Sequence, residues 1–299
     1  MAIPTVTPTP KSAPVTTFWD GRLILRWLRH NPASAFGVAI IVLLIVLAAF
    51  APLLTPYGPL QDNSGATLLP PSAQHLFGTG SFGEDIFSRV VYGARFDLAI
   101  GFGTVAIGLV LGCAIGAVAG YWEGWLGEVL MRAMDLLLAF PQFVLAMAVV
   151  AALGGSLLNV IIAIALTNIP IYANLMRVRI LMLKGSQFAM AARSVGNPKL
   201  RVLTRHLLPN SWGPIFVQAT LQPGWAILSA AGLSFIGLGI HVPEPEWGVM
   251  VAMGSDYIMA GQWWVSFFPG LFIVLAVMGF NLVGDGLEEL LDPQRRGQA

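Results

Sequence analysis

Side chains that could carry out catalysis are scarce in this sequence, and none is arranged as a known catalytic site. The four histidines, His30, His75, His206 and His241, lie outside the long apolar runs, and no His-Glu-x-x-His segment occurs. Ser234 lies in an apolar run with no histidine to activate its hydroxyl. No Gly-x-x-x-x-Gly-Lys-Ser/Thr segment is present to cradle the phosphates of ATP. The sequence therefore predicts no catalytic residues, no metal ligands and no cofactor in this chain.

The clearest pattern of spacing lies in a polar segment, Phe188 to Asn210, which carries five basic residues if its histidine is counted. Good helix formers over Ser186 to Val195 are followed by Gly196 and an Asn-Pro pair. Glycine accepts positive φ, and the residue before a proline avoids the α region. The pattern predicts a helix over Ser186 to Val195, a turn at Gly196, and a second helical stretch from Lys199 to Leu208.

The chemistry of this segment is that of a contact surface. Ala191 and Ala192 give the first predicted helix a face that another molecule can approach closely, while Arg193 and the other basic residues keep the rest solvated. One interpretation is a docking surface for a partner protein. The other is an amphipathic loop held at the anionic heads of membrane lipids. On the residues alone, the second interpretation is the simpler one.

The composition indicates a membrane protein. Of the 299 residues, 56% are hydrophobic and 10% are charged, whereas a soluble domain usually has about a quarter of its residues charged. The mean hydropathy is +0.75. The formal net charge of +1 gives no basic field, so nucleic acid is not an expected partner. The one cysteine, Cys113, lies in an apolar run and is expected to pack as a small hydrophobe.

Six uncharged stretches are long enough, or nearly so, to cross a bilayer core as helices, which takes roughly 20 residues. Backbone groups inside a membrane must be satisfied internally, so helices are expected throughout. The sequence therefore predicts an all-α polytopic membrane protein with six transmembrane helices. The predicted spans are Gly37 to Leu54, Leu98 to Gly120, Leu136 to Leu153, Leu157 to Met176, Trp212 to Ile240, and Trp263 to Gly284.

Lysine and arginine residues fall almost entirely on one side of these spans. Alternate connecting segments hold 14 of the 16, and short loops rich in such residues stay in the cytoplasm. Both termini are therefore expected to be cytoplasmic, and residues 241–262 to face outward. The predicted division is a cytoplasmic leader over 1–34 with a disordered start at 1–17, a first transmembrane helix over 35–54, an extracytoplasmic loop over 55–95, a five-helix core over 96–284 with a cytoplasmic loop at 177–211, and a cytoplasmic tail over 285–299.

Glycines recur at every fourth residue in the second predicted span. Lipid supplies no hydrophobic drive between helices, so a strip without side chains lets another helix backbone approach closely and gain dispersion contacts. The predicted partner of this strip is a helix of the same bundle or of a second subunit. The strip comprises Gly108, Gly112, Gly116 and Gly120.

Two prolines, Pro141 and Pro170, are predicted to interrupt neighbouring spans, because each removes a backbone donor and bends the helix. Together with Asn168, Gln218 and Gln222 they are candidates for lining a polar route; kinks and amides that only shape packing are the alternative. The middles of the spans carry no charge, whereas a proton or ion relay would need intramembrane carboxylates, lysines or histidines. This weakens the case for a proton-driven secondary carrier.

The polar segment resembles the cytoplasmic loop of permease subunits of binding-protein-dependent ATP-binding-cassette (ABC) importers. The family signature is Glu-Ala-Ala, three residues, glycine, nine residues, and an apolar-x-Leu-Pro close. This sequence has Met190 in place of the glutamate and His206 in place of the apolar residue. The matching residues are Ala191, Ala192, Gly196, Leu208 and Pro209.

The resemblance extends over roughly His75 to Arg295 and narrows to the second permease subunit of the dipeptide, oligopeptide and nickel importers. It implies the type I permease fold, with a coupling helix between the fourth and fifth spans, in the inner membrane of a bacterium. The implied partners are a second homologous permease, two ABC ATPase subunits that hold ATP and Mg, an extracytoplasmic substrate-binding protein, and membrane lipid. The residues that it assigns to ATPase coupling are Ala191, Ala192, Arg193, Gly196, Leu208 and Pro209.

Several substrates fit this interpretation. Short peptides follow from the family resemblance, and nickel chelates, glutathione and small oligosaccharides are alternatives within the same class. The spans offer no cluster of His, Cys or carboxylates that would argue for a bare metal ion. Outside that class, a channel or secondary carrier and an intramembrane enzyme are the remaining alternatives.

Overall fold

The computed structural model describes residues 27, 29, 31–122 and 124–291, and the named elements of this part of the chain are all helical. The disordered start predicted over 1–17, and residues 292–299 of the predicted tail, lie outside the described residues. The all-α class is confirmed. The helices are α2 (Pro32–Leu54), α3 (Ile86–Tyr121), α4 (Trp125–Leu138), α5 (Gln142–Leu153), α6 (Leu157–Lys184), α7 (Gln187–Ser194), α8 (Lys199–Val202), the π-helix η2 (Leu203–Leu207), α9 (Leu208–Phe235), α10 (Trp247–Ser255) and α11 (Trp264–Leu291).

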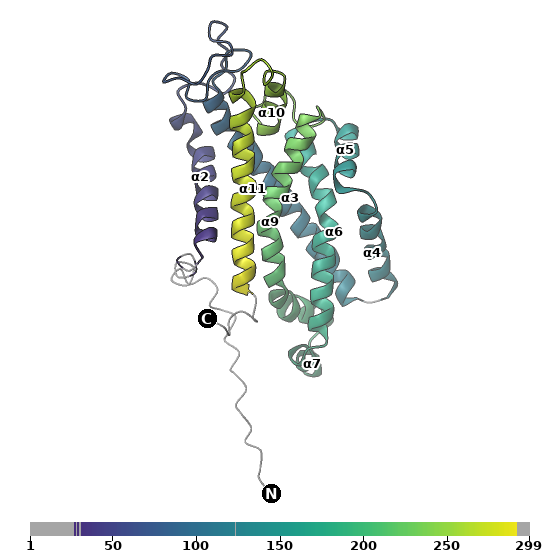
Figure 1. The fold of residues 1–299 in the computed structure, drawn as a ribbon. Coiled ribbons are helices and arrows are strands. Elements are labelled where there is room, and N and C mark those ends of the chain that lie inside the picture. Colours follow the sequence, from purple (N-terminus) through teal and green to yellow (C-terminus); the bar gives the residue numbers. More distant parts are fainter. Residues whose placement is uncertain (1–26, 28, 30, 123, 292–299) are drawn as a thin grey trace.

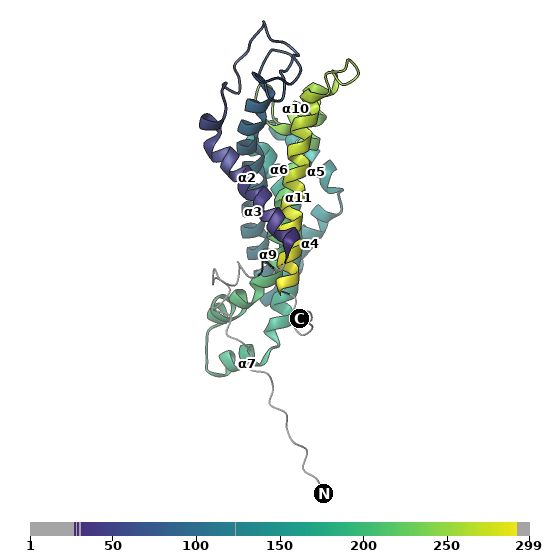
Figure 2. The same ribbon diagram turned by 60° about the vertical axis from the view of Figure 1, so that its left-hand side comes forward.

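The long helices run side by side along one axis of the molecule (Figure 1). Helix α3 packs on α2, α6 and α9, and α11 packs on α2, α9 and α10. Helix α7 protrudes at one end of the bundle, the end at which α2 begins and α11 finishes, while α10 and the connection between α2 and α3 lie at the other end (Figure 2). The bundle thus has two ends with different folded elements, which are called the α7 end and the α10 end below.

Several of these helices can cross a membrane. Helices α2, α3, α6 and α11 are long and apolar enough, and α4 and α5 pass the same test only as a pair. Helix α9 is as long as α6, with 28 residues, but it contains Pro214 and Pro223 and is not among the helices that pass this test. By length and composition, the described residues therefore contain four spans, or five with the bent pair.

The two prolines predicted to break spans behave differently. Pro141 stands in a real break, where α4 ends at Leu138, α5 begins at Gln142, and the pair is bent by 90°. The predicted interruption at Pro141 is therefore present, because its extended backbone (ψ 126°) cannot continue α4, and the two helices pass the length and composition test for a span only together. Pro170, in contrast, is buried inside an uninterrupted α6, so the prediction of an interruption there is wrong.

The glycine strip of α3 lies against α6 of the same chain. A Cβ atom on Gly112 would lie 2.6 Å from the Ile169 carbonyl oxygen, and one on Gly120 would lie 2.9 Å from the Arg177 carbonyl oxygen. A Cβ atom on Gly108 would lie 3.3 Å from Cε2 of the Tyr172 ring. These contacts hold the two helices at backbone distance, which is the geometry that small residues permit in membranes.

Three elements differ from the predicted boundaries. Helix α3 begins at Ile86 rather than Leu98, because the Asp85 side chain caps it by accepting a hydrogen bond from the Ser88 N–H at 2.8 Å. The segment predicted as an outward-facing loop over 241–262 contains a helix, α10. Helix α9 starts and ends earlier than the predicted fifth span, at Leu208 and Phe235.

Candidate functional site

Helix α7 and its turn form as the residue pattern predicts. The helix spans Gln187–Ser194, and Gly196 follows it with a φ of +80°, in the left-handed region. The Gly196 N–H donates to the Arg193 carbonyl at 2.9 Å. The Asn197 side-chain amide donates to the Ala192 carbonyl at 2.9 Å and closes the end of the helix. The element is a folded helix and turn at the α7 end of the bundle.

The two alanines of the signature do not share one exposed face, contrary to the prediction. Ala192 is only 7% exposed and packs, with the fully buried Ala189, into a hydrophobic cluster of this chain. Ala191 points to the outside. The cluster around Ala192 includes Ile180 of α6 and Leu207 of η2. Ala192 therefore fixes α7 to its own bundle and is not open to a partner.

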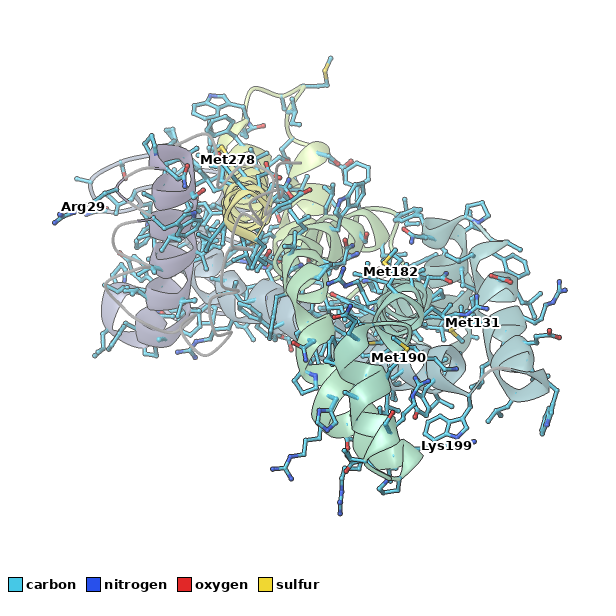
Figure 3. All side chains as sticks on the ribbon, turned by 90° about the horizontal axis from the view of Figure 1, so that it is seen from below. Arg29, Met131, Met182, Met190, Lys199 and Met278 are labelled. Carbon is cyan, nitrogen blue, oxygen red and sulfur yellow. The ribbon has the colours of Figure 1, made fainter. Side chains whose placement is uncertain are left out.

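The outward face of α7 carries an apolar strip. Phe188 is 42% exposed and Val195, just after the helix, is 79% exposed; with the exposed Ala191 they follow the i, i+3, i+7 spacing of one helix face. Met190, which replaces the signature glutamate, is also exposed, at 51%. Figure 3 looks at the molecule from this end, where Met190 and Lys199 lie. Phe188, Ala191 and Val195 are called the α7 strip below.

The loop is connected to two long helices, by a hydrogen bond to α6 and by continuous helical backbone to α9. The Arg193 guanidinium donates to the Lys184 carbonyl at the end of α6, at 3.0 Å. On the other side, α8, η2 and α9 follow one another without a break in the helical backbone. Leu208 is the first residue of α9 and is half-buried, and Pro209, the second, is exposed. A force on α7 would therefore reach both α6 and α9.

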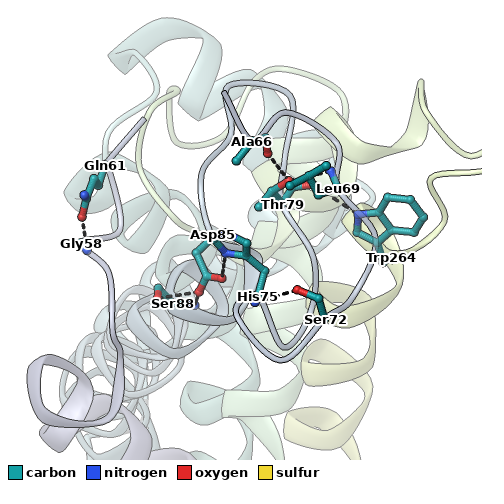
Figure 4. Close-up of polar contacts among 10 residues, drawn as sticks. All are labelled: Gly58, Gln61, Ala66, Leu69, Ser72, His75, Thr79, Asp85, Ser88 and Trp264. Atoms are coloured by element: carbon teal, nitrogen blue, oxygen red, sulfur yellow. Dashed lines mark hydrogen bonds and ion pairs between the residues drawn. The ribbon is translucent and has the colours of Figure 1, made fainter. Parts of the chain in front are cut away.

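At the α10 end, the long connection between α2 and α3 is folded by side-chain hydrogen bonds (Figure 4). His75 Nδ1 lies 2.9 Å from Asp85 Oδ1, and the Ser88 hydroxyl donates to the other oxygen of Asp85 at 2.7 Å. The Trp264 indole N–H of α11 donates to the Thr79 carbonyl at 3.2 Å. The connection is thus pinned to the starts of both α3 and α11.

A buried ion pair joins two outer segments. Arg89 Nη1 of α3 lies 3.5 Å from Glu84 Oε1, and both side chains are about 5% exposed or less. The second guanidinium nitrogen, Nη2, donates to the Pro243 carbonyl at 3.3 Å. Arg89 therefore links the start of α3 to the segment that leads into α10.

Helix α10 is held on α3 by its first residues. Trp247 is fully buried; its backbone N–H donates to Asp97 Oδ2 at 3.2 Å and its indole N–H to the Val90 carbonyl at 2.9 Å. The Glu246 side chain caps α10 by accepting from the Gly248 and Val249 N–H groups, each at 2.8 Å. Burial raises the pKa of Glu246, and these hydrogen bonds oppose that rise.

The candidates for lining a polar route are spread over three places. Asn168 and Pro170 are buried in α6, with the Asn168 Cβ near Gly108. Gln218 and the buried Gln222 lie one turn apart on α9. Pro141 is exposed in the break between α4 and α5. The described structure brings no more than two of them together on one helix.

The sequence did not predict that Asp97, Glu246, Trp247 and the Arg89 ion pair lie together in the structure. The available indication was a short run of charged residues just before the second predicted span. The contacts that join the two segments, Asp97 with Trp247 and Arg89 with Pro243, span 150 residues or more along the chain, so no local pattern could pair them.

These features place the chain in the class of multi-pass helical membrane proteins. They are the apolar helices, the bundle packed through glycines, and the folded polar loop at one end. The chain belongs to the family of binding-protein-dependent transport system inner membrane components, whose model matches residues 108–297. The model for the N-terminal TM domain of oligopeptide transport permease C matches residues 17–71. The family predicted from the loop signature is therefore confirmed.

Curated relatives match nearly from end to end. The dipeptide transport system permease protein of Alkalihalophilus pseudofirmus is 44% identical over 99% of this chain and 98% of its own length. A probable D,D-dipeptide transport system permease protein of Escherichia coli K12 is 42% identical over 94% of each chain. A glutathione transport system permease protein of Escherichia coli O157:H7 is 43% identical over 99% of this chain and 96% of its own.

Proposed function

We propose that this chain is the membrane-spanning permease subunit of an ATP-driven importer of dipeptides or oligopeptides and forms one half of the translocation pathway. The observation that carries the proposal is the end-to-end similarity to dipeptide permeases at 42–44% identity. The glutathione permease at 43% identity supports a second candidate substrate, glutathione, which is itself a small peptide. Both candidate substrates contain peptide bonds, so the importer would recognise a peptide backbone in either case.

In this proposal the chain crosses the inner membrane six times, with α9 and the bent pair α4 and α5 counted among the spans. The α7 end faces the cytoplasm and the α10 end faces outward. The distribution of basic residues supports this orientation, because Arg89 and Arg95 are the only lysines or arginines of the described residues that lie in the elements of the α10 end. A second permease completes the pathway, two ATPase subunits supply ATP hydrolysis with Mg, and a binding protein delivers substrate to the α10 end.

The α7 strip is the proposed contact with the ATPase. Apolar side chains that remain exposed on a folded, polar loop mark an interaction site. The back of α7 is already packed, through Ala189 and Ala192, on the bundle. The docking face therefore consists of Phe188, Ala191 and Val195, and Gly196 provides the turn that returns the chain to α9.

The substrate assignment is tested with the complete importer, reconstituted in proteoliposomes with its second permease, ATPase subunits and binding protein. We expect ATP-dependent accumulation of a radiolabelled dipeptide, with stronger competition by unlabelled dipeptides than by glutathione. Accumulation of glutathione but of no peptide would select the second candidate. Uptake that persists without ATP would contradict the importer and favour a secondary carrier.

The coupling assignment is tested by Ala191→Arg. The added guanidinium projects from the α7 strip without entering the core of this chain, so the permease should fold while peptide uptake and stimulated ATPase activity fall at least tenfold. Thr204→Arg, an exposed position of η2 outside the α7 strip, is the matched control and should retain uptake. Ala192→Arg should instead destabilise the permease itself, because Ala192 is buried. Normal uptake by Ala191→Arg would rule out the α7 strip as the docking face.

A further inference from the structure

Two buried carboxyl groups meet where α10 begins on α3. Asp97 of α3 and Glu246 before α10 are both 0% exposed. Three consecutive backbone N–H groups are divided between them: that of Trp247 donates to Asp97 Oδ2, and those of Gly248 and Val249 donate to Glu246. The two acids are thus neighbours at one helix start.

No described cationic side chain is positioned to neutralise this pair. On α3, Arg89 pairs with Glu84 and the Pro243 carbonyl, and Arg95 donates to the carbonyls of Ala48 and Ala49 on α2. Helices α2, α9 and α10 contain no charged residue, and the charged residues of α6 and α11 lie at the α7 end of those helices. In the segment before α10, Glu244 adds a further negative charge and the His241 ring lies against Gly155. Two ionised carboxylates buried at one helix start, with no described cationic side chain beside them, are strongly disfavoured, and a neutral form of one of them removes the repulsion.

The hydrogen bonds distinguish the two acids. Both oxygens of Glu246 accept a backbone N–H at 2.8 Å, which suits the ionised carboxylate. Asp97 uses only Oδ2, and its Oδ1 is buried without a hydrogen-bond partner in the described structure. A proton on that oxygen removes the cost of an unpaired buried charge. The oxygen without a partner is therefore the place for the proton.

We propose that Asp97 carries a proton at neutral pH and, as a neutral acid, is the positioning residue that holds α10 on α3. Trp247 lies between them, with its indole bonded to the Val90 carbonyl and its ring against Gly93, where a Cβ atom would lie 2.7 Å from Cδ1. Loss of the proton places a second negative charge beside Glu246 and repels the start of α10. The link to transport rests on the proposed function, in which the α10 end receives the substrate.

The test compares amide variants of the two acids in the assembled importer in nanodiscs. Asp97→Asn reproduces the shape of the neutral acid, so its thermal midpoint and peptide uptake should stay close to those of the unmodified protein. Glu246→Gln replaces one acceptor oxygen by an NH₂ group facing a backbone N–H, so its midpoint should fall clearly and uptake should fall at least tenfold. Asp97→Ala leaves the Trp247 N–H without its acceptor and should be less stable than Asp97→Asn.

The pH dependence of the thermal midpoint is the second measurement. If Asp97 had only a structural role, this pH dependence would not change in Asp97→Asn. A proton held in the native state and released on unfolding makes the unfolding equilibrium more favourable by up to tenfold for each pH unit of increase. The midpoint of the unmodified protein should therefore fall, relative to that of Asp97→Asn, as the pH rises from 6 to 9. Equal damage from Asp97→Asn and Glu246→Gln, or a pH-independent difference, would overturn the proposal. Neither midpoint depends on the transported substrate, so the result is separate from the test of the proposed function.

Discussion

Replacing Gly116 by leucine is expected to prevent α3 and α6 from packing, so that no assembled importer can be isolated. A Cβ atom on Gly116 would meet the Ala173 carbonyl group, with its carbon at 2.9 Å. The obstructing atoms belong to the backbone of α6 and cannot turn aside as a side chain could. Overpacking usually lowers the free energy of unfolding by about 1–3 kcal/mol. Because the contact here is with rigid backbone, the loss for this variant should lie at or above the upper end of that range. The measurement is the amount of full-length chain recovered in complex with its partners.

Gly213→Leu is the matched control for this variant. Gly213 also lies inside a long helix, α9, but a Cβ atom there would have no neighbour within 4 Å in this chain. The control should therefore accumulate in the membrane and fold. Gly116→Ala should give an intermediate yield, because it adds the clashing Cβ atom alone. A Gly116→Leu protein that assembles as well as the control would show that α3 and α6 are not held at backbone distance.

The parts of the fold that follow from local pattern were predicted from the sequence. Hydropathy alone places α2, α3, α6 and α11, since each contains a long apolar stretch. The helix and turn at Gly196 follow from backbone preferences that act within a few residues. The glycine strip of α3 likewise needs only a period of four residues and the absence of side chains.

The parts that depend on distant contacts were not predicted. Pro141 and Pro170 have the same local effect on a helix, yet only Pro141 breaks one; Pro170 is buried in an uninterrupted α6 that packs on α3. Ala191 and Ala192 are equivalent in sequence, and only the seating of α7 against residues such as Leu207 makes one exposed and the other buried. The pairing of Asp97 with Trp247 joins residues separated by 150 positions.

Arg89→Met is expected to destabilise the α10 end more than any other single change of a charged residue discussed above. Methionine fills much of the volume of the arginine stem but leaves the Glu84 carboxylate, 3% exposed, without its cation. Breaking a buried ion pair by removing one partner costs about 3–5 kcal/mol. For a chain of this size that corresponds to a fall in the thermal midpoint on the order of 10 °C. The measurement is the thermal midpoint of the purified importer.

The double variant Arg89→Met with Glu84→Gln separates the cost of an orphaned charge from the value of the pair itself. The Glu84→Gln change removes the negative charge, and the oxygen of the new amide can still accept the Phe82 N–H that Glu84 Oε2 accepts at 2.8 Å. Neutral replacements of buried ion pairs are often close to harmless, so most of the lost midpoint should return. The link from Arg89 to the Pro243 carbonyl would remain broken in both variants. If the double variant is as unstable as Arg89→Met alone, that backbone contact, rather than the ion pair, holds the outer segments together.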